Sequence, residues 1–140
     1  MAGYSGTPLA QKLGIKPGAT VVVINAPTNY QKLLGKSASD ARFTIRVGAD
    51  ANFIHFFTKH RAELEKQLDR LRTKLADSGT LWVSWPKKSS GVTTDITEDV
   101  IRAVALPLGF VDTKVCAVDE TWSGLKLMIR RENRKSTITK

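Results

Sequence analysis

The amino-acid sequence predicts a single α/β domain in which a mixed, mostly parallel sheet of five or six strands lies between helices on both faces. Three observations predict this class. Thr20–Ile24 is an unbroken run of β-branched residues, typical of a central strand that is covered on both faces. Residues 59–77 carry one apolar stripe at helical spacing. Two alternating segments near the carboxyl end predict an antiparallel hairpin.

The amino-terminal part predicts short helices between strands. A proline at the start of residues 8–14 and a glycine at their end indicate a helical turn, and residues 29–36 form a second short helix closed by Gly35. Residues 41–47 alternate as a half-exposed strand, and residues 52–57 form a second central strand. Because only about four residues join these two strands, we expect them to be antiparallel neighbours, unless one is not a strand.

The middle of the chain predicts a long helix followed by a buried strand. The stripe of the helix consists of Leu64, Leu68, Leu71 and Leu75, spaced by four and three residues. Thr80–Trp85 is the third buried strand, and residues 87–94 make a polar loop after it.

A second helix and a hairpin complete the predicted domain. Asp95 is expected to cap this helix, with Glu98 reaching back to it. The hairpin pairs residues 111–118 with residues 125–130 across a six-residue loop, 119–124.

Charge and composition bound the function classes. We expect residues 1–131 to form the domain and residues 132–140 a basic, flexible tail. The net charge of +9 would suit a nucleic-acid partner, but residues 95–120 are acidic, so solubility is the simpler explanation. The chain shows no membrane span and no secretory signal, which indicates a cytoplasmic protein. Cys116 is the single cysteine, so an internal disulfide is excluded.

Two resemblances follow from the order of these elements. Residues 75–86 are similar to the helix end, glycine turn and fifth strand of Rossmann-like methyltransferases that use S-adenosylmethionine, and residues 108–110 are similar to their entry into the closing hairpin. A closer resemblance covers nearly the whole chain and is carried by residues 1–18, 57–64, 85–88 and 119–125. These segments are similar to a bacterial family catalogued as domain of unknown function 3052, which brings no established activity.

The methyltransferase resemblance lacks its cofactor-binding residues. A methyltransferase would need a glycine-rich loop after the first strand, but this chain continues as Asn25-Ala26-Pro27 and has no glycine before Gly35. It would also need an acidic residue at the end of the second strand to hold the ribose, and the nearest carboxylate is Asp50. The sequence therefore predicts no cofactor.

The strongest candidate site is the loop that follows Thr80–Trp85, because ligands of open α/β sheets collect at the carboxyl ends of parallel strands. We expect this loop to adjoin Asn25 and Pro27 as a crevice with Trp122 as a further wall. Lysines and hydroxyls in this loop suit an anion, although an exposed connecting loop would look the same. Trp122 could equally pack on the sheet. The candidate ligand-binding residues are Asn25, Pro27, Trp85, Lys87, Lys88, Ser89, Ser90, Gly91 and Trp122.

Catalytic and metal-binding residues are not predicted. His55 and His60 have the wrong spacing for a helical metal pair, and His55 is expected to be a hydrogen-bonded residue within the sheet. Cys116 alternates within a strand, which favours a structural thiol.

The sequence thus favours a non-catalytic binding domain for a small anionic ligand or a partner protein. One alternative is a nucleic-acid-associated protein that uses Lys87, Lys88 and the basic tail. Another is a methyltransferase-like enzyme with an atypical site.

The missing glycine loop and the missing ribose carboxylate predict that the protein does not bind S-adenosylmethionine at micromolar strength. Isothermal titration calorimetry checks this expectation. Micromolar binding that is competed by S-adenosylhomocysteine would contradict it.

Overall fold

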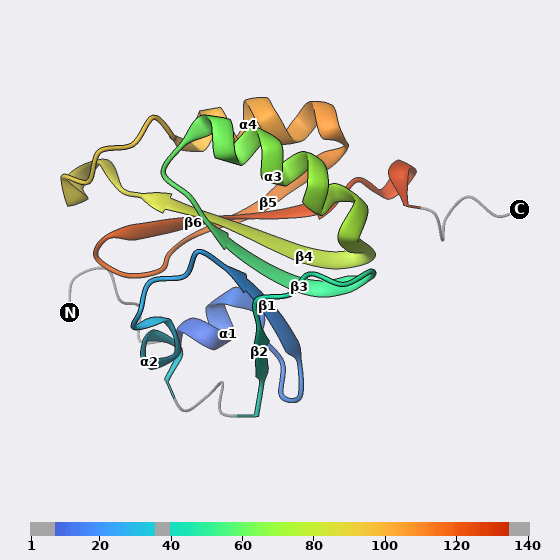
Figure 1. Ribbon diagram of the computed structural model, residues 1–140, viewed down its shortest axis with the longest axis horizontal. Helices are drawn as coiled ribbons and strands as arrows, with labels where there is room; N and C mark the ends of the chain where they lie inside the picture. Colours follow the sequence, from blue (N-terminus) through green and yellow to red (C-terminus); the bar gives the residue numbers. More distant parts are fainter. Residues whose placement is uncertain (1–7, 36–39, 135–140) are drawn as a thin grey trace, which may run out of the picture.

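The computed structural model describes residues 8–35 and 40–134 of the chain and confirms the predicted fold class. Figure 1 shows one mixed sheet between two layers of helices. The strand order is β2-β1-β3-β4-β6-β5. The strands are β1 (Thr20–Ile24), β2 (Arg42–Thr44), β3 (Ala51–Phe57), β4 (Leu75–Pro86), β5 (Phe110–Ala117) and β6 (Trp122–Ile129). The helices are α1 (Leu9–Leu13), α2 (Tyr30–Leu34), α3 (Arg61–Lys74) and α4 (Glu98–Ala105), with short 3-10 turns η2 (Lys88–Ser90), η3 (Leu106–Leu108) and η4 (Arg131–Asn133).

Strands β2, β1, β3 and β4 are parallel, and the hairpin β5–β6 joins them through an antiparallel pairing of β6 with β4. Helices α3 and α4 cover one face of the sheet, whereas α1 and α2 lie on the other (Figure 1). The core under α3 includes the buried Leu64, Leu68 and Leu71, as their spacing predicts. The opposite core includes the buried Leu13 and Trp82, and the Trp82 indole donates a 2.8 Å hydrogen bond to the Leu13 carbonyl.

The expectation that residues 41–47 and 52–57 are antiparallel neighbours is wrong. Strands β2 and β3 lie on opposite sides of β1, and each pairs with β1 in parallel. The usual long crossover is needed when the chain must return along a full-length strand. Here β2 is only three residues long, so the short connection 45–50 suffices to reach the start of β3.

Two predicted helix boundaries also change. Helix α3 ends at Lys74, so Leu75 packs in the core as the first residue of β4 rather than as part of the helix. The cap of α4 is Thr97, whose hydroxyl accepts a hydrogen bond from the backbone N–H of Val100. Asp95, which was expected to cap α4, instead accepts a 2.7 Å hydrogen bond from the Arg61 backbone N–H at the start of α3.

The hairpin loop is shorter than predicted because Trp122 already belongs to β6. The Asp119 carboxylate accepts hydrogen bonds from the backbone N–H groups of Thr121 and Trp122, which closes the turn tightly. In the segment predicted as a tail, Glu132 and Asn133 belong to turn η4 and Arg134 follows it. Residues 135–140 lie outside the described residues. No helix in the described part of the chain is long and apolar enough to cross a membrane.

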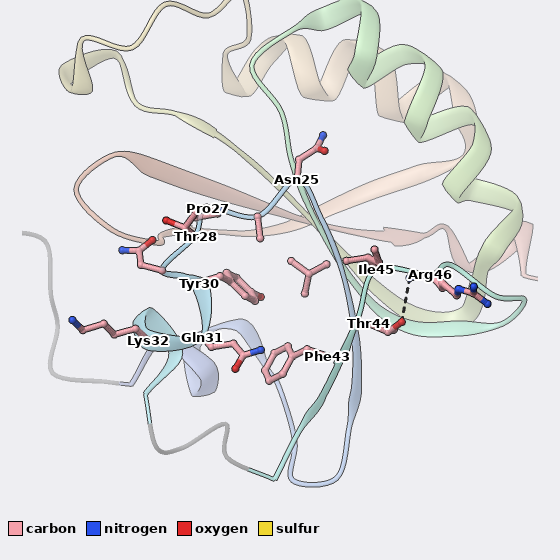
Figure 2. A pocket seen from close by; sticks show the side chains of 13 residues that line it. Asn25, Pro27, Thr28, Tyr30, Gln31, Lys32, Phe43, Thr44, Ile45 and Arg46 are labelled. Carbon is pink, nitrogen blue, oxygen red and sulfur yellow. Dashed lines mark hydrogen bonds between the residues drawn. The ribbon is translucent and has the colours of Figure 1, made fainter.

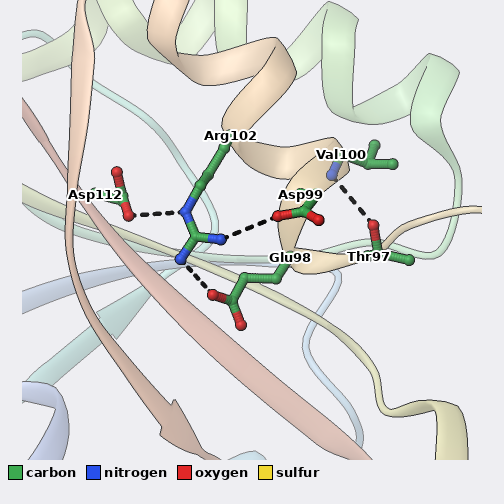
Figure 3. A network of polar contacts seen from close by, with 6 residues as sticks. All are labelled: Thr97, Glu98, Asp99, Val100, Arg102 and Asp112. Atoms are coloured by element: carbon green, nitrogen blue, oxygen red, sulfur yellow. Dashed lines mark hydrogen bonds and ion pairs between the residues drawn. The ribbon is translucent and has the colours of Figure 1, made fainter.

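Arg102 joins α4 to the hairpin through a cluster of carboxylates (Figure 3). Its guanidinium binds Asp112 on β5 at 2.9 Å, Asp99 at 3.3 Å and Glu98. The hydrogen bond from Arg102 holds the pKa of Asp112 below its ordinary value of 3.8. A carboxyl group whose pKa is lower in the folded state contributes stability above its unfolded pKa and loses it as the pH falls through the folded value.

Replacing Arg102 by glutamine is therefore expected to lower stability at pH 7, and the difference from the wild type should shrink as the pH falls below 3.8. Urea unfolding between pH 7 and pH 3 measures it. Arg70→Gln, at an exposed arginine of α3, is the control. A pH-independent difference for Arg102→Gln would show that the ion pair with Asp112 does not contribute.

Candidate functional site

The carboxyl ends of β1, β3 and β4 meet at one edge of the sheet, because these strands are parallel. The loop that begins at Asn25 and the loop that begins at Lys87 both leave this edge, as the sequence predicts. However, β3 separates β1 from β4, so the two loops do not follow adjacent strands. The switch point of the sheet, where successive connections turn to opposite sides, lies between β1 and β3.

A cavity of about 960 Å³ opens beyond β1 and β2, on the face of the sheet that carries α2. We call it the outer slot. Figure 2 shows that side chains from both strands and from α2 surround it. Its walls include Val23, Pro27, Tyr30, Gln31, Phe43 and Ile45.

The walls of the outer slot combine apolar and aromatic side chains with polar ones, including Lys32 and Arg46. The rings of Tyr30 and Phe43 meet edge to face, with their centroids 6.1 Å apart. Ile45 is 84% exposed although it continues the line of β2, so this large apolar side chain has little protein packed against it. The Gln31 side chain adds an amide that can donate and accept hydrogen bonds. Such walls suit a flat, apolar group with polar edges.

A chain of buried hydrogen bonds fixes Tyr30 at the slot. The Tyr30 hydroxyl lies 2.8 Å from Nδ1 of His55 on β3, and Nε2 of His55 lies 2.7 Å from the Ser84 hydroxyl on β4. This confirms the prediction that His55 is a hydrogen-bonded residue of the sheet. Burial lowers the pKa of His55 to about 3 and raises the pKa of Tyr30, so both side chains are neutral at physiological pH.

The switch point is bridged by the protein's own side chains. Asn25 adopts the left-handed conformation with φ of 60°, and its amide donates a 3.0 Å hydrogen bond to the Glu63 carboxylate. The Thr58 hydroxyl, just after β3, donates a 2.6 Å hydrogen bond to the other oxygen of Glu63. We call this the switch-point bridge. It joins the loop after β1, the loop after β3 and the first turn of α3.

A second cavity, of about 520 Å³, lies between the end of β4 and the start of α4. Trp85, Lys88 and Gly91 line it, together with Glu98. The Glu98 carboxylate in this lining is bound by Arg102. We call this cavity the β4 groove.

The structure divides the predicted site residues among several places. Asn25 and Pro27 line the outer slot, whereas Trp85, Lys88 and Gly91 line the β4 groove. The Lys87 backbone N–H donates a hydrogen bond to the Thr121 carbonyl, and the Lys87 carbonyl accepts one from the Ser90 hydroxyl. These two hydrogen bonds hold turn η2 in place. Ser89 is exposed on this turn.

Trp122 packs against the sheet rather than lining either cavity. Its ring contacts Phe57 edge to face, with their centroids 5.1 Å apart. This is the packing role that the sequence left open for it. Cys116 is buried on the same face, and burial raises the pKa of its thiol, which fits a structural role.

Sequence reasoning missed most of the outer slot. Tyr30, Phe43 and Ile45 were assigned to a short helix and a strand, and Glu63 to the polar side of a long helix. One observation could have found the slot. The strand pattern puts Phe43 and Ile45 on one face, but of the two short helices on that face only α2 lines the slot beside them.

Comparison with solved structures shows that the fold is shared with methyltransferases. A SAM-dependent methyltransferase from Aquifex aeolicus has a TM-score of 0.64 and 14% identity, with 87% of this chain and 88% of that chain covered. A TehB-like SAM-dependent methyltransferase from Corynebacterium glutamicum has a TM-score of 0.52 and 10% identity, with coverages of 87% and 85%. A ribosomal protein L11 methylase from Lactobacillus delbrueckii has a TM-score of 0.53 and 10% identity, with coverages of 88% and 76%.

These comparisons confirm the Rossmann-like, methyltransferase-like fold and correct one expectation. The sequence favoured a chain that is not an enzyme, but these three solved structures of the same fold are methyltransferases, which points to an enzyme. No family model and no curated protein matches the sequence, so membership of the family of unknown function 3052 is not confirmed.

The residues present do not fit S-adenosylmethionine in the pose that a Rossmann-like site gives its ligand. The loop after β1 holds Pro27 instead of glycines, and Thr44, Ile45 and Arg46 provide no carboxylate for the ribose at the end of β2. The switch-point bridge fills the position between β1 and β3, where a ligand tail would cross.

The buried, neutral state of His55 predicts that acid destabilises the fold. Below its ordinary pKa of 6.5 the unfolded chain binds a proton at this residue, while the folded chain does so only near pH 3. The stability of the wild type relative to His55→Gln should therefore fall by about 1 kcal/mol between pH 7 and pH 5.5. Urea unfolding measures it.

The matched control is His60→Gln, since His60 is exposed. Its stability relative to the wild type should stay constant over the same pH range. Parallel pH profiles for the wild type and His55→Gln would show that His55 is not neutral and buried.

Proposed function

We propose that this chain is an enzyme of the methyltransferase fold that binds a nucleoside-type small molecule, with the base in the outer slot. One observation carries the proposal. A cavity with aromatic and apolar walls lies beyond β1 and β2, and it exposes Ile45, a large apolar side chain that a ligand would cover.

The slot matches the shape and chemistry of a nucleobase. A flat ring between Tyr30 and Phe43 on one side and Ile45 on the other would bury its faces against apolar surface. The amide of Gln31 can pair with the donors and acceptors on the edge of a base. The hydroxyls of Thr28 and Thr44 also line the slot and suit a ribose.

The side chains of the slot favour group transfer over hydrolysis. Its described lining contains no carboxylate, histidine or cysteine, so it lacks the acid–base pair and the thiol that hydrolases use. Transfer of a group from an activated donor depends mainly on how the two reactants are positioned. We infer a reaction of this class.

A second candidate is methyl transfer from S-adenosylmethionine, which is favoured by the similarity to SAM-dependent methyltransferases. The loop after β1 lacks the glycines that S-adenosylmethionine needs, and the switch-point bridge fills the position where its tail would cross. Both observations weigh against methyl transfer. Micromolar binding of S-adenosylmethionine would favour methyl transfer, whereas binding of adenosine without binding of S-adenosylmethionine would favour the first candidate.

The β4 groove is a separate proposal for the small anion expected from the sequence. The loop Lys87–Gly91 would hold it, since Lys88 and Gly91 line the groove. Replacing Lys87 and Lys88 by alanine is expected to leave nucleoside binding in the outer slot unchanged.

The proposed function predicts that adenosine binds and that Ile45→Asp weakens this binding at least about tenfold, because a carboxylate would replace the apolar wall. Calorimetry at pH 7 measures both affinities. The control is Val115→Asp, since Val115 is also an exposed apolar residue but lies on β5, away from the slot. Equal affinities of the two variants would exclude the outer slot, and no adenosine binding to the wild type would overturn the proposed function.

A further inference from the structure

We propose that Glu63 determines the specificity of the site, by excluding ligands that carry an anionic group on the ribose 5′ position. The inference rests on the proposed function and names the substrate class: a nucleoside whose 5′ substituent is small and either neutral or cationic, so that it stops short of the switch-point bridge. Nucleotides with a 5′ phosphate would be rejected.

The position of Glu63 supports this role. Asn25 lines the outer slot, and its side chain points away from the slot (Figure 2). Its amide donates a hydrogen bond to Glu63. The carboxylate therefore lies one hydrogen bond beyond the slot, at the switch point between β1 and β3. A substituent that leaves the slot along the carboxyl edge of the sheet would approach it.

The carboxylate is held in place rather than free to swing away. Asn25 and Thr58 bind its two oxygens at 3.0 and 2.6 Å, and Glu63 is only partly exposed on the first turn of α3. Both partners are neutral. Within the described residues, no lysine or arginine forms an ion pair with Glu63, so its negative charge is not cancelled locally.

The start of α3 offers no compensating attraction for an anion. Phosphates commonly bind the free backbone N–H groups at a helix amino terminus. Here Asp95 already accepts a hydrogen bond from the Arg61 N–H, and the Arg61 side chain pairs with Glu65. The cations nearest the site are Lys59, before α3, and Lys32 and Arg46, which line the outer slot. All three are exposed to solvent, where screening weakens their attraction for an anion. The Asp95 carboxylate thus already binds one of the N–H groups that a phosphate would use.

Three ligands that share the base and ribose test the inference. They are adenosine, adenosine 5′-monophosphate and 5′-amino-5′-deoxyadenosine, which carry a neutral, an anionic and a cationic 5′ group. Calorimetry on the wild-type protein should show that the monophosphate binds at least about tenfold more weakly than adenosine, and that the amine binds at least as tightly. Equal binding of adenosine and the monophosphate would overturn the inference while leaving the proposed function intact.

The variant Glu63→Gln removes the charge and keeps the size of the side chain. It should abolish most of the difference between adenosine and the monophosphate without weakening adenosine. Glu65→Gln changes net charge equally on the same helix, away from the switch point, and should keep the wild-type difference. A Glu63→Gln variant that still rejects the monophosphate, or a Glu65→Gln variant that accepts it, would contradict a role for Glu63.

Thermal unfolding of each variant shows whether it folds. If Glu63→Gln does not fold, the salt dependence of the wild type decides. Raising the salt from 0.05 to 0.5 M should narrow the gap between the monophosphate and adenosine, because screening weakens charge repulsion. An unchanged gap would assign the rejection to shape rather than to Glu63. Failure of all three ligands to bind would instead overturn the proposed function.

Discussion

The hydrogen-bond chain Tyr30–His55–Ser84 is the interaction on which the site depends. It joins α2 to the centre of the sheet through two short contacts in an otherwise apolar layer. Helix α2 is only five residues long, so it cannot hold its own position by helix propensity. The buried, neutral histidine sets where Tyr30 stands, and Tyr30 forms one wall of the outer slot.

The second constraint is the way the sheet edge is filled. In an open α/β sheet the switch point is the natural place for a ligand. This chain places Glu63 there and holds it with Asn25 and Thr58, which leaves the outer side of β1 as the open space. The fold of a methyltransferase is thus kept, while the part of the edge that remains open differs. Ligand choice follows from those few side chains rather than from the fold.

The sequence predicted the strands and helices where patterns are local and strong. The run at Thr20–Ile24 and the leucine stripe of α3 lie where they were expected. The predicted direction of β2 and the predicted cap of α4 were wrong, because each depends on a part of the chain that is distant in sequence. Strand β2 pairs in parallel with β1, and Asp95 binds the Arg61 N–H instead of capping α4. The outer slot was missed for the same reason, since its walls come from separate segments that only the folded sheet brings together.

A structure of the protein with bound adenosine tests the central claim most directly. The account predicts the base in the outer slot, against Tyr30, Phe43 and Ile45, with the ribose near Asn25 and its 5′ position facing Glu63. Adenosine bound in the β4 groove, or across the switch point with the hydrogen bonds from Asn25 and Thr58 to Glu63 broken, would contradict it.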